Sequence, residues 1–195
     1  MMHKISLAVS AWLEQEGVIS NQEKNIYSYA VYSIIFGMMP LFLSVFLGSL
    51  FGMMFEGILL IFPFMLIRKF SGGFHLGSVK KCIVFSGSIL ILSFCVIKYL
   101  AFADHVPLLK PLVWASTCGL CIFSPIDSDA RELKPKEIKL FGKLARIIAT
   151  TLLITYLILD FLKISKMAIP IGVGILLASL LQLPCIVNKV VHKGN

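Results

Sequence analysis

One histidine and one cysteine lie seven residues apart in a short polar stretch between two long apolar runs. His75 and Cys82 fall within residues 68–82, where lysines at 80 and 81 directly precede the cysteine. A cysteine attacks as its thiolate, so it needs a neighbouring base or positive surroundings. His75 could take the proton, and Lys80 and Lys81 could supply the positive field. The residue types in this stretch therefore indicate nucleophilic thiol chemistry.

The spacing of the pair places a condition on the backbone. In a continuous α-helix seven residues span about 10.5 Å, which is too far for proton transfer. Three glycines before position 78 interrupt helix formation, and Ser78 is a suitable N-cap for a helix that carries Cys82 in its first turn. We expect a bent segment that returns His75 to the sulfur, with the helix dipole favouring the thiolate. A basic juxtamembrane loop with a passive thiol is the alternative that these residues alone leave open.

The other cysteines are not expected to react. The chain has five cysteines, and four of them lie in apolar runs, where they act as small hydrophobic residues. Cys118 and Cys121 form a C-x-x-C motif, but no soluble redox fold surrounds them, so we expect packing. A zinc site would need about four ligands, and the remaining histidines are far away in the sequence. The sequence therefore predicts no disulfide framework, no metal and no cofactor.

The composition places the pair in a membrane protein. Of the 195 residues 58% are hydrophobic and 14% are charged, against about 25% charged in soluble domains. The mean hydropathy is +0.92. A transmembrane helix needs about 20 apolar residues, and the strict alternation of a transmembrane barrel is absent. We therefore predict an all-α, polytopic integral membrane protein.

Apolar runs bounded by charged residues predict about six transmembrane helices after an N-terminal amphipathic helix. The predicted spans are 27–48, 50–67, 83–103, 106–124, 147–162 and 167–188. A tight break around Gly48, Ser49 and Gly52 divides the first two. Residues 1–26 contain no continuous apolar stretch, so we expect an interfacial amphipathic segment and no cleavable signal peptide. The predicted organisation is thus an N-terminal segment 1–26, a transmembrane domain 27–188 with a catalytic loop 68–82, and a cytoplasmic tail 189–195.

The distribution of lysine and arginine predicts the orientation in the membrane. With six spans and both ends on one side, that side receives fourteen of these residues and the opposite side four. Because cytoplasmic loops carry the excess, both termini and the 68–82 loop are expected in the cytoplasm. The formal charge of +8 then suits anionic lipids or an acidic ligand at the inner leaflet. Nucleic acid is not expected as a partner, because there is no soluble basic domain.

The motif Arg68-x-x-x-Gly72-Gly73-x-His75-x-x-x-x-x-x-Cys82 resembles the accessory gene regulator B (AgrB) family. The segment 123–127, Phe-Ser-Pro-Ile-Asp, is similar to the Pro-x-Asp segment of that family, and a basic stretch follows it. Members of the family are polytopic membrane cysteine endopeptidases of about this length that process precursors of bacterial quorum-sensing peptides. Tyr32 departs from the acidic or amide residue of many relatives, which leaves a third catalytic partner open.

The resemblance implies a reaction and its partners. Cys82 would be the nucleophile and His75 its base and later its acid. The enzyme would cleave the C-terminal tail of a small, AgrD-like precursor through a thioester, and an internal Cys or Ser of the peptide would then close a thiolactone or lactone. The resemblance also implies a homodimer in the bacterial cell membrane.

Further residues of the two motifs have a functional and a structural interpretation each. Arg68 would orient peptide carboxyl groups or bind lipid phosphate. Gly72 and Gly73 would present N–H groups to an oxyanion or simply permit the turn. Asp127 would orient His75, hold Arg68 or act as a plain helix-end acid.

The basic residues of the cytoplasmic side would attract an acidic precursor tail, with phosphatidylglycerol as the competing ligand. They comprise Lys80 and Lys81 together with Arg131, Lys134, Lys136, Lys139, Lys143 and Arg146. Two other functions remain open. One is a small multi-pass transporter or channel, with Glu56 and Asp160 along its path. The other is a membrane assembly protein with the loop as a docking patch.

Overall fold

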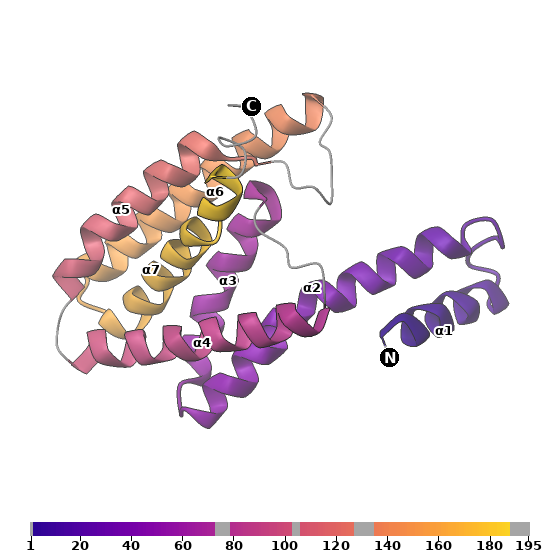
Figure 1. Ribbon diagram of the computed structural model, residues 1–195, viewed down its shortest axis with the longest axis horizontal. Helices are drawn as coiled ribbons and strands as arrows, with labels where there is room; N and C mark the ends of the chain where they lie inside the picture. The colour runs from indigo at the N-terminus through magenta and orange to yellow at the C-terminus, as the bar shows by residue number, and fades with distance from the viewer. Residues whose placement is uncertain (1, 73–78, 103–105, 127–134, 188–195) are drawn as a thin grey trace. The chain divides into compact units, whose positions relative to one another are not determined.

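The chain is helical in the part that the computed structural model describes, which comprises residues 2–72, 79–102, 106–126 and 135–187. The α-helices of these ranges are α1 (Met2–Gln15), α2 (Lys24–Leu50), α3 (Met54–Ser71), α4 (Val79–Phe102), α5 (Val106–Phe123), α6 (Pro135–Phe161) and α7 (Ser165–Leu180) (Figure 1). No strand occurs within them. The expected all-α fold is therefore confirmed. The chain divides into two compact units, residues 1–43 and 44–195.

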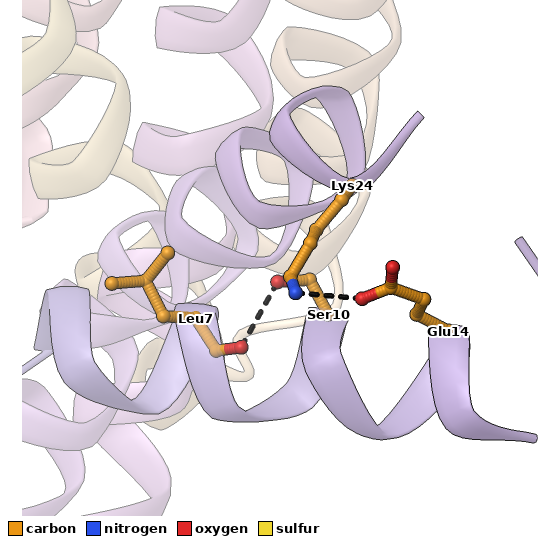
Figure 2. Close-up of polar contacts among 4 residues, drawn as sticks. All are labelled: Leu7, Ser10, Glu14 and Lys24. Atoms are coloured by element: carbon orange, nitrogen blue, oxygen red, sulfur yellow. Dashed lines mark hydrogen bonds and ion pairs between the residues drawn. The ribbon is translucent and has the colours of Figure 1, made fainter. Parts of the chain in front are cut away.

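Polar side chains join α1 to the start of α2 in the first unit. Lys24 Nζ lies 2.6 Å from Glu14 Oε2 (Figure 2). The hydroxyl groups of Ser6 and Ser28 are 3.4 Å apart and both residues are buried. The Ser10 hydroxyl donates to a carbonyl one turn back in its own helix at 3.0 Å. Serines therefore line the face of α1 that meets α2.

Several large apolar residues of α1 are exposed. Ile5 is 43% exposed and Trp12 57%, so the predicted amphipathic helix is present. The turn before α2 carries a capping interaction, in which the backbone N–H and the hydroxyl of Ser20 donate to Glu23 Oε2 at 3.0 and 2.8 Å. These hydrogen bonds hold the pKa of the exposed Glu23 carboxyl below its usual range.

A tight turn separates α2 from α3, as the sequence predicts. Gly52 has a φ of +68°, a conformation that glycine adopts without a steric penalty. The Met53 N–H donates to the Gly48 carbonyl at 2.7 Å. An added Cβ at Gly48 would lie 2.9 Å from the Met53 carbonyl oxygen, so a larger residue would have to displace the turn.

Helix α7 is the core of the second unit and contacts α3, α4, α5 and α6 (Figure 1). Small residues allow the close approach of its neighbours. An added Cβ at Gly174 would overlap the carbonyl oxygen of Leu60 in α3. One at Gly172 would lie 3.0 Å from Cε2 of the buried Tyr156 in α6 and 2.9 Å from Cδ2 of Leu109 in α5. The backbone of α7 therefore packs directly against three other helices.

Helices α2 to α7 correspond to the six predicted spans. Within the described residues, four segments are long and apolar enough to cross a membrane: 24–50, 81–101, 136–161 and 165–187. The apolar part of α5 is shorter, and α3 contains three charged residues, Glu56, Arg68 and Lys69. The membrane protein that the composition indicates is thus confirmed at the level of its helices.

One helix begins well before its predicted span. The sequence predicts a span from residue 147, whereas α6 begins at Pro135. Residues 135–146 mix lysines with apolar side chains, so a search for uncharged runs excludes them even though they form an amphipathic helix. Proline is suited to the first helical position, because its missing N–H has no partner there.

Candidate active site

The structure describes part of the predicted site. Arg68, Gly72, Lys81 and Cys82 are described with their side chains, and Lys80 through its backbone. The remaining predicted residues lie outside the described residues: Gly73, His75, Asp127, Arg131 and Lys134. The proximity of His75 to Cys82 therefore stays a prediction. The structure does describe the helices next to these residues in the sequence, which are α3, α4, α5 and α6.

Cys82 lies in the first turn of α4, because the helix begins at Val79. This confirms the predicted position of the thiol at a helix N-terminus, where the dipole favours an anion. The thiol is half-buried and free. The guanidinium of Arg68, at the end of α3, interacts electrostatically with the sulfur atoms of Cys82 and Cys185. A fixed positive charge therefore lies within range of the candidate nucleophile.

The backbone after α3 is joined to the backbone after α5. The Ile126 N–H donates to the Ser71 carbonyl at 2.9 Å. Gly72 ends α3 with φ +74° and ψ −166°, and an added Cβ there would overlap the Ile126 carbonyl oxygen. Gly72 precedes His75 by three residues, and Ile126 directly precedes Asp127. The two motifs that the sequence singled out, far apart along the chain, thus start from one junction.

A glutamine at the end of α7 completes this junction. Gln182 is 1% exposed. Its Nε2 donates to the Ser71 carbonyl at 3.4 Å and to the Ser124 hydroxyl oxygen at 3.1 Å. The residue types and spacing did not indicate a role for Gln182. The available signal was one amide inside an apolar run, and an intramembrane polar residue usually has a partner or a function.

Helix α6 packs against both chain segments of the junction, the end of α3 and the segment after α5. The rings of Phe70 and Phe141 meet edge to face, with centroids 6.0 Å apart. An added Cβ at Gly142 would lie 3.0 Å from Cδ of Pro125. A larger residue than glycine at this position would therefore press on the Pro-x-Asp segment. Through these contacts the amphipathic start of α6 becomes part of the site.

Two ion pairs lie at the opposite ends of the same helices. Glu56, in the first turn of α3, is 3.7 Å from Lys166 at the start of α7. Asp160, near the end of α6, is 2.6 Å from Lys110 in the first half of α5. The two acids that a transporter path would use are thus paired with lysines near helix ends.

These observations define a helical membrane protein with a thiol at a helix N-terminus, within electrostatic range of a guanidinium. A sequence model of the accessory gene regulator B family matches residues 6–184. The chain belongs to the accessory gene regulator B (AgrB) family.

The individual relatives have low sequence identity to this chain. Two AgrB-like proteins of Clostridium perfringens, from strains SM101 and 13, are each 27% identical to this chain over 96 residues. The match covers 49% of this chain and 44% of each relative. The chain therefore spans less than half of the length of the curated relatives that it matches. No solved structure matches the chain.

Proposed function

We propose that this protein is a membrane cysteine endopeptidase that removes the C-terminal tail of a small signal-peptide precursor and promotes its cyclisation. The observation that carries the proposal is the position of Cys82, in the first turn of α4 and within electrostatic range of Arg68. A positive charge and a helix N-terminus both favour the thiolate, which is the attacking form. The junction of Ser71 with Ile126 supports it, because His75 and Asp127 follow these residues closely.

In the proposed reaction His75 takes the thiol proton of Cys82, and the sulfur bonds to the carbonyl carbon of the scissile peptide. The C–N bond then breaks, His75 protonates the leaving amine, and the tail departs. The peptide remains on Cys82 as a thioester. An internal Cys or Ser of the peptide attacks this carbon, which closes the thiolactone or lactone ring and releases the Cys82 sulfur. Excluding water at the bilayer surface protects the thioester from hydrolysis.

Four further residues are proposed to assist. Arg68 favours the thiolate and orients the bound peptide. Gly72 and Gly73 direct backbone N–H groups at the developing oxyanion. Asp127 orients His75, as a carboxylate commonly does for a catalytic histidine.

We place the enzyme in the bacterial cell membrane with both termini and the site in the cytoplasm, as a homodimer in contact with anionic lipids. Lys80, Lys81, Arg131 and Lys134 are proposed to attract the acidic tail of the precursor. The precursor itself is expected to be encoded beside this gene, as a short peptide with an amphipathic start, a central Cys or Ser and an acidic end.

The test is cleavage of that precursor by the purified full chain in liposomes. Cys82→Ala is expected to abolish tail release, and His75→Ala to lower its rate by about a hundred- to ten-thousandfold. Cys95→Ala is the matched control, since Cys95 is an exposed thiol further along the same helix. Wild-type protein should incorporate iodoacetamide at Cys82 near neutral pH. Normal cleavage by Cys82→Ala would overturn the proposal.

The transporter alternative is less well supported. Its two acids are held in ion pairs with Lys166 and Lys110. A transporter would keep its solute flux in Cys82→Ala, so the same variant separates the two functions.

A further inference from the structure

The carbonyl oxygen of Ser71 is the meeting point of three chain segments. It accepts the Ile126 N–H at 2.9 Å and the Gln182 side-chain amide at 3.4 Å. The same amide nitrogen donates to the Ser124 hydroxyl oxygen at 3.1 Å. A side chain 111 residues from Ser71 and 58 from Ser124 thus links the end of α3 to the segment after α5.

The arrangement uses the hydrogen-bonding capacity of both groups. A side-chain amide carries two N–H donors, and each of them has an acceptor here. A carbonyl oxygen has two lone pairs, and Ser71 uses both. Gln182 and Ser71 are each 1% exposed and Ser124 is 6% exposed, so water does not readily replace a lost donor. Removing the amide would leave the buried Ser71 carbonyl and Ser124 hydroxyl oxygen each without one hydrogen-bond donor. The end of α3 and the segment after α5 could then separate.

From this geometry we infer that Gln182 is a positioning residue, which holds the end of α3 against the segment that follows α5. The inference rests on the proposed function. His75 lies four residues after Ser71, and Asp127 three after Ser124. Because both predicted partners of Cys82 follow the junction within four residues of the sequence, we expect a displacement of the junction to lower the activity. Since Gln182 follows the last residue of α7 by two positions, the core helix is also connected to this junction.

The experiment substitutes Gln182→Met, which keeps the length and apolar volume of the side chain and removes both donors. We expect kcat per folded enzyme to fall by about 10- to 100-fold, with KM for the precursor within about twofold. The rate of Cys82 alkylation by iodoacetamide should be measured as a function of pH. We expect the midpoint of this pH profile to shift to higher pH. A role in folding alone would lower the yield of folded protein and leave both readouts of the folded fraction unchanged.

Two companion variants sharpen the result. Ser124→Ala removes one of the two acceptors, so its loss of kcat should be smaller, and the double variant should be no worse than Gln182→Met alone. Thr117→Val is the matched control, because Thr117 is buried and its hydroxyl donates within its own helix α5, to the Val113 carbonyl at 2.9 Å. It should keep kcat and the alkylation profile. If Gln182→Met does not fold, Ser124→Ala decides by the same two readouts.

The variants distinguish the positioning role of Gln182 from the proposed peptidase activity. If Cys82→Ala is inactive while Gln182→Met keeps full kcat and an unchanged alkylation profile, the positioning role is wrong and the peptidase stands. If Cys82→Ala cleaves the precursor, the proposed function fails, and the positioning role fails with it. A double variant that loses much more kcat than Gln182→Met would show that Ser124 acts independently of Gln182.

Discussion

Gly72 ends α3 in a backbone conformation that side chains rarely adopt. Its φ of +74° with ψ of −166° lies in a region that is essentially restricted to glycine. We expect Gly72→Ala to lower the free energy of unfolding by about 1–3 kcal/mol through the backbone alone. The overlap of the new Cβ with the Ile126 carbonyl adds to this loss and displaces the junction. Thermal unfolding in detergent and precursor cleavage measure the two effects.

Gly87→Ala supplies the control for this prediction. Gly87 lies within α4, and an added Cβ there meets no atom within 4 Å. The change should be neutral or stabilise the helix by about 0.5–1 kcal/mol, because alanine loses less entropy in a helix. Equal unfolding midpoints for Gly72→Ala and Gly87→Ala would show that the junction tolerates a side chain.

Residue types and spacing were enough to predict Cys82 at a helix start and a bend at Gly72. They were not enough for Gln182. Its partners are backbone and hydroxyl groups of other segments, which leave no periodic pattern near position 182. The electrostatic interaction of Arg68 with Cys185 could not be predicted for the same reason. Bonds between distant segments depend on how helices pack, and packing is set by many small residues together.

At the scale of elements, the amphipathic start of α6 presents a row of positive charges. Its four cations are spaced by three, four and three residues, so they share one face of the helix. All four are exposed: Lys136, Lys139, Lys143 and Arg146. Uncharged runs predicted the six apolar helices but not residues 135–146 of α6. The charges of these residues lower the mean hydropathy to a value that is typical of a loop. The face belongs to the helix that packs against Pro125 and Phe70.

This face gives a prediction about substrate choice. Lys139→Gln combined with Lys143→Gln should raise KM for an acidic-tailed precursor roughly fivefold, since exposed charge pairs contribute about 0.2–1 kcal/mol each. The effect should shrink as salt increases. Cleavage assays with acidic and neutral tails at two ionic strengths measure it. The control combines Lys98→Gln with Lys163→Gln, two lysines that are exposed outside this face. It should leave KM for the acidic-tailed precursor unchanged. Equal cleavage of both tails by the wild type would contradict the prediction.

At the scale of the whole molecule, the second unit separates its polar groups between the two ends of its helices. The junction of Ser71, Ser124 and Gln182 uses the C-terminal ends of α3, α5 and α7. The ion pair of Glu56 with Lys166 uses the N-terminal ends of α3 and α7. Such a division is expected of helices that cross a membrane, because polar groups are costly in the hydrocarbon region.

The orientation itself can be tested on the intact chain. The six predicted spans place fourteen of the eighteen lysines and arginines on the side of the candidate site, and we expect such an excess on the cytoplasmic side. Green fluorescent protein fused after Asn195 should therefore fluoresce, and alkaline phosphatase inserted between Phe102 and Val106 should be active, because it folds only outside the cytoplasm. Each reporter at the other position is the control and should be silent. Active phosphatase after Asn195 would place the thiol on the outer face. A precursor made in the cytoplasm would then have to cross the membrane before its tail was cut.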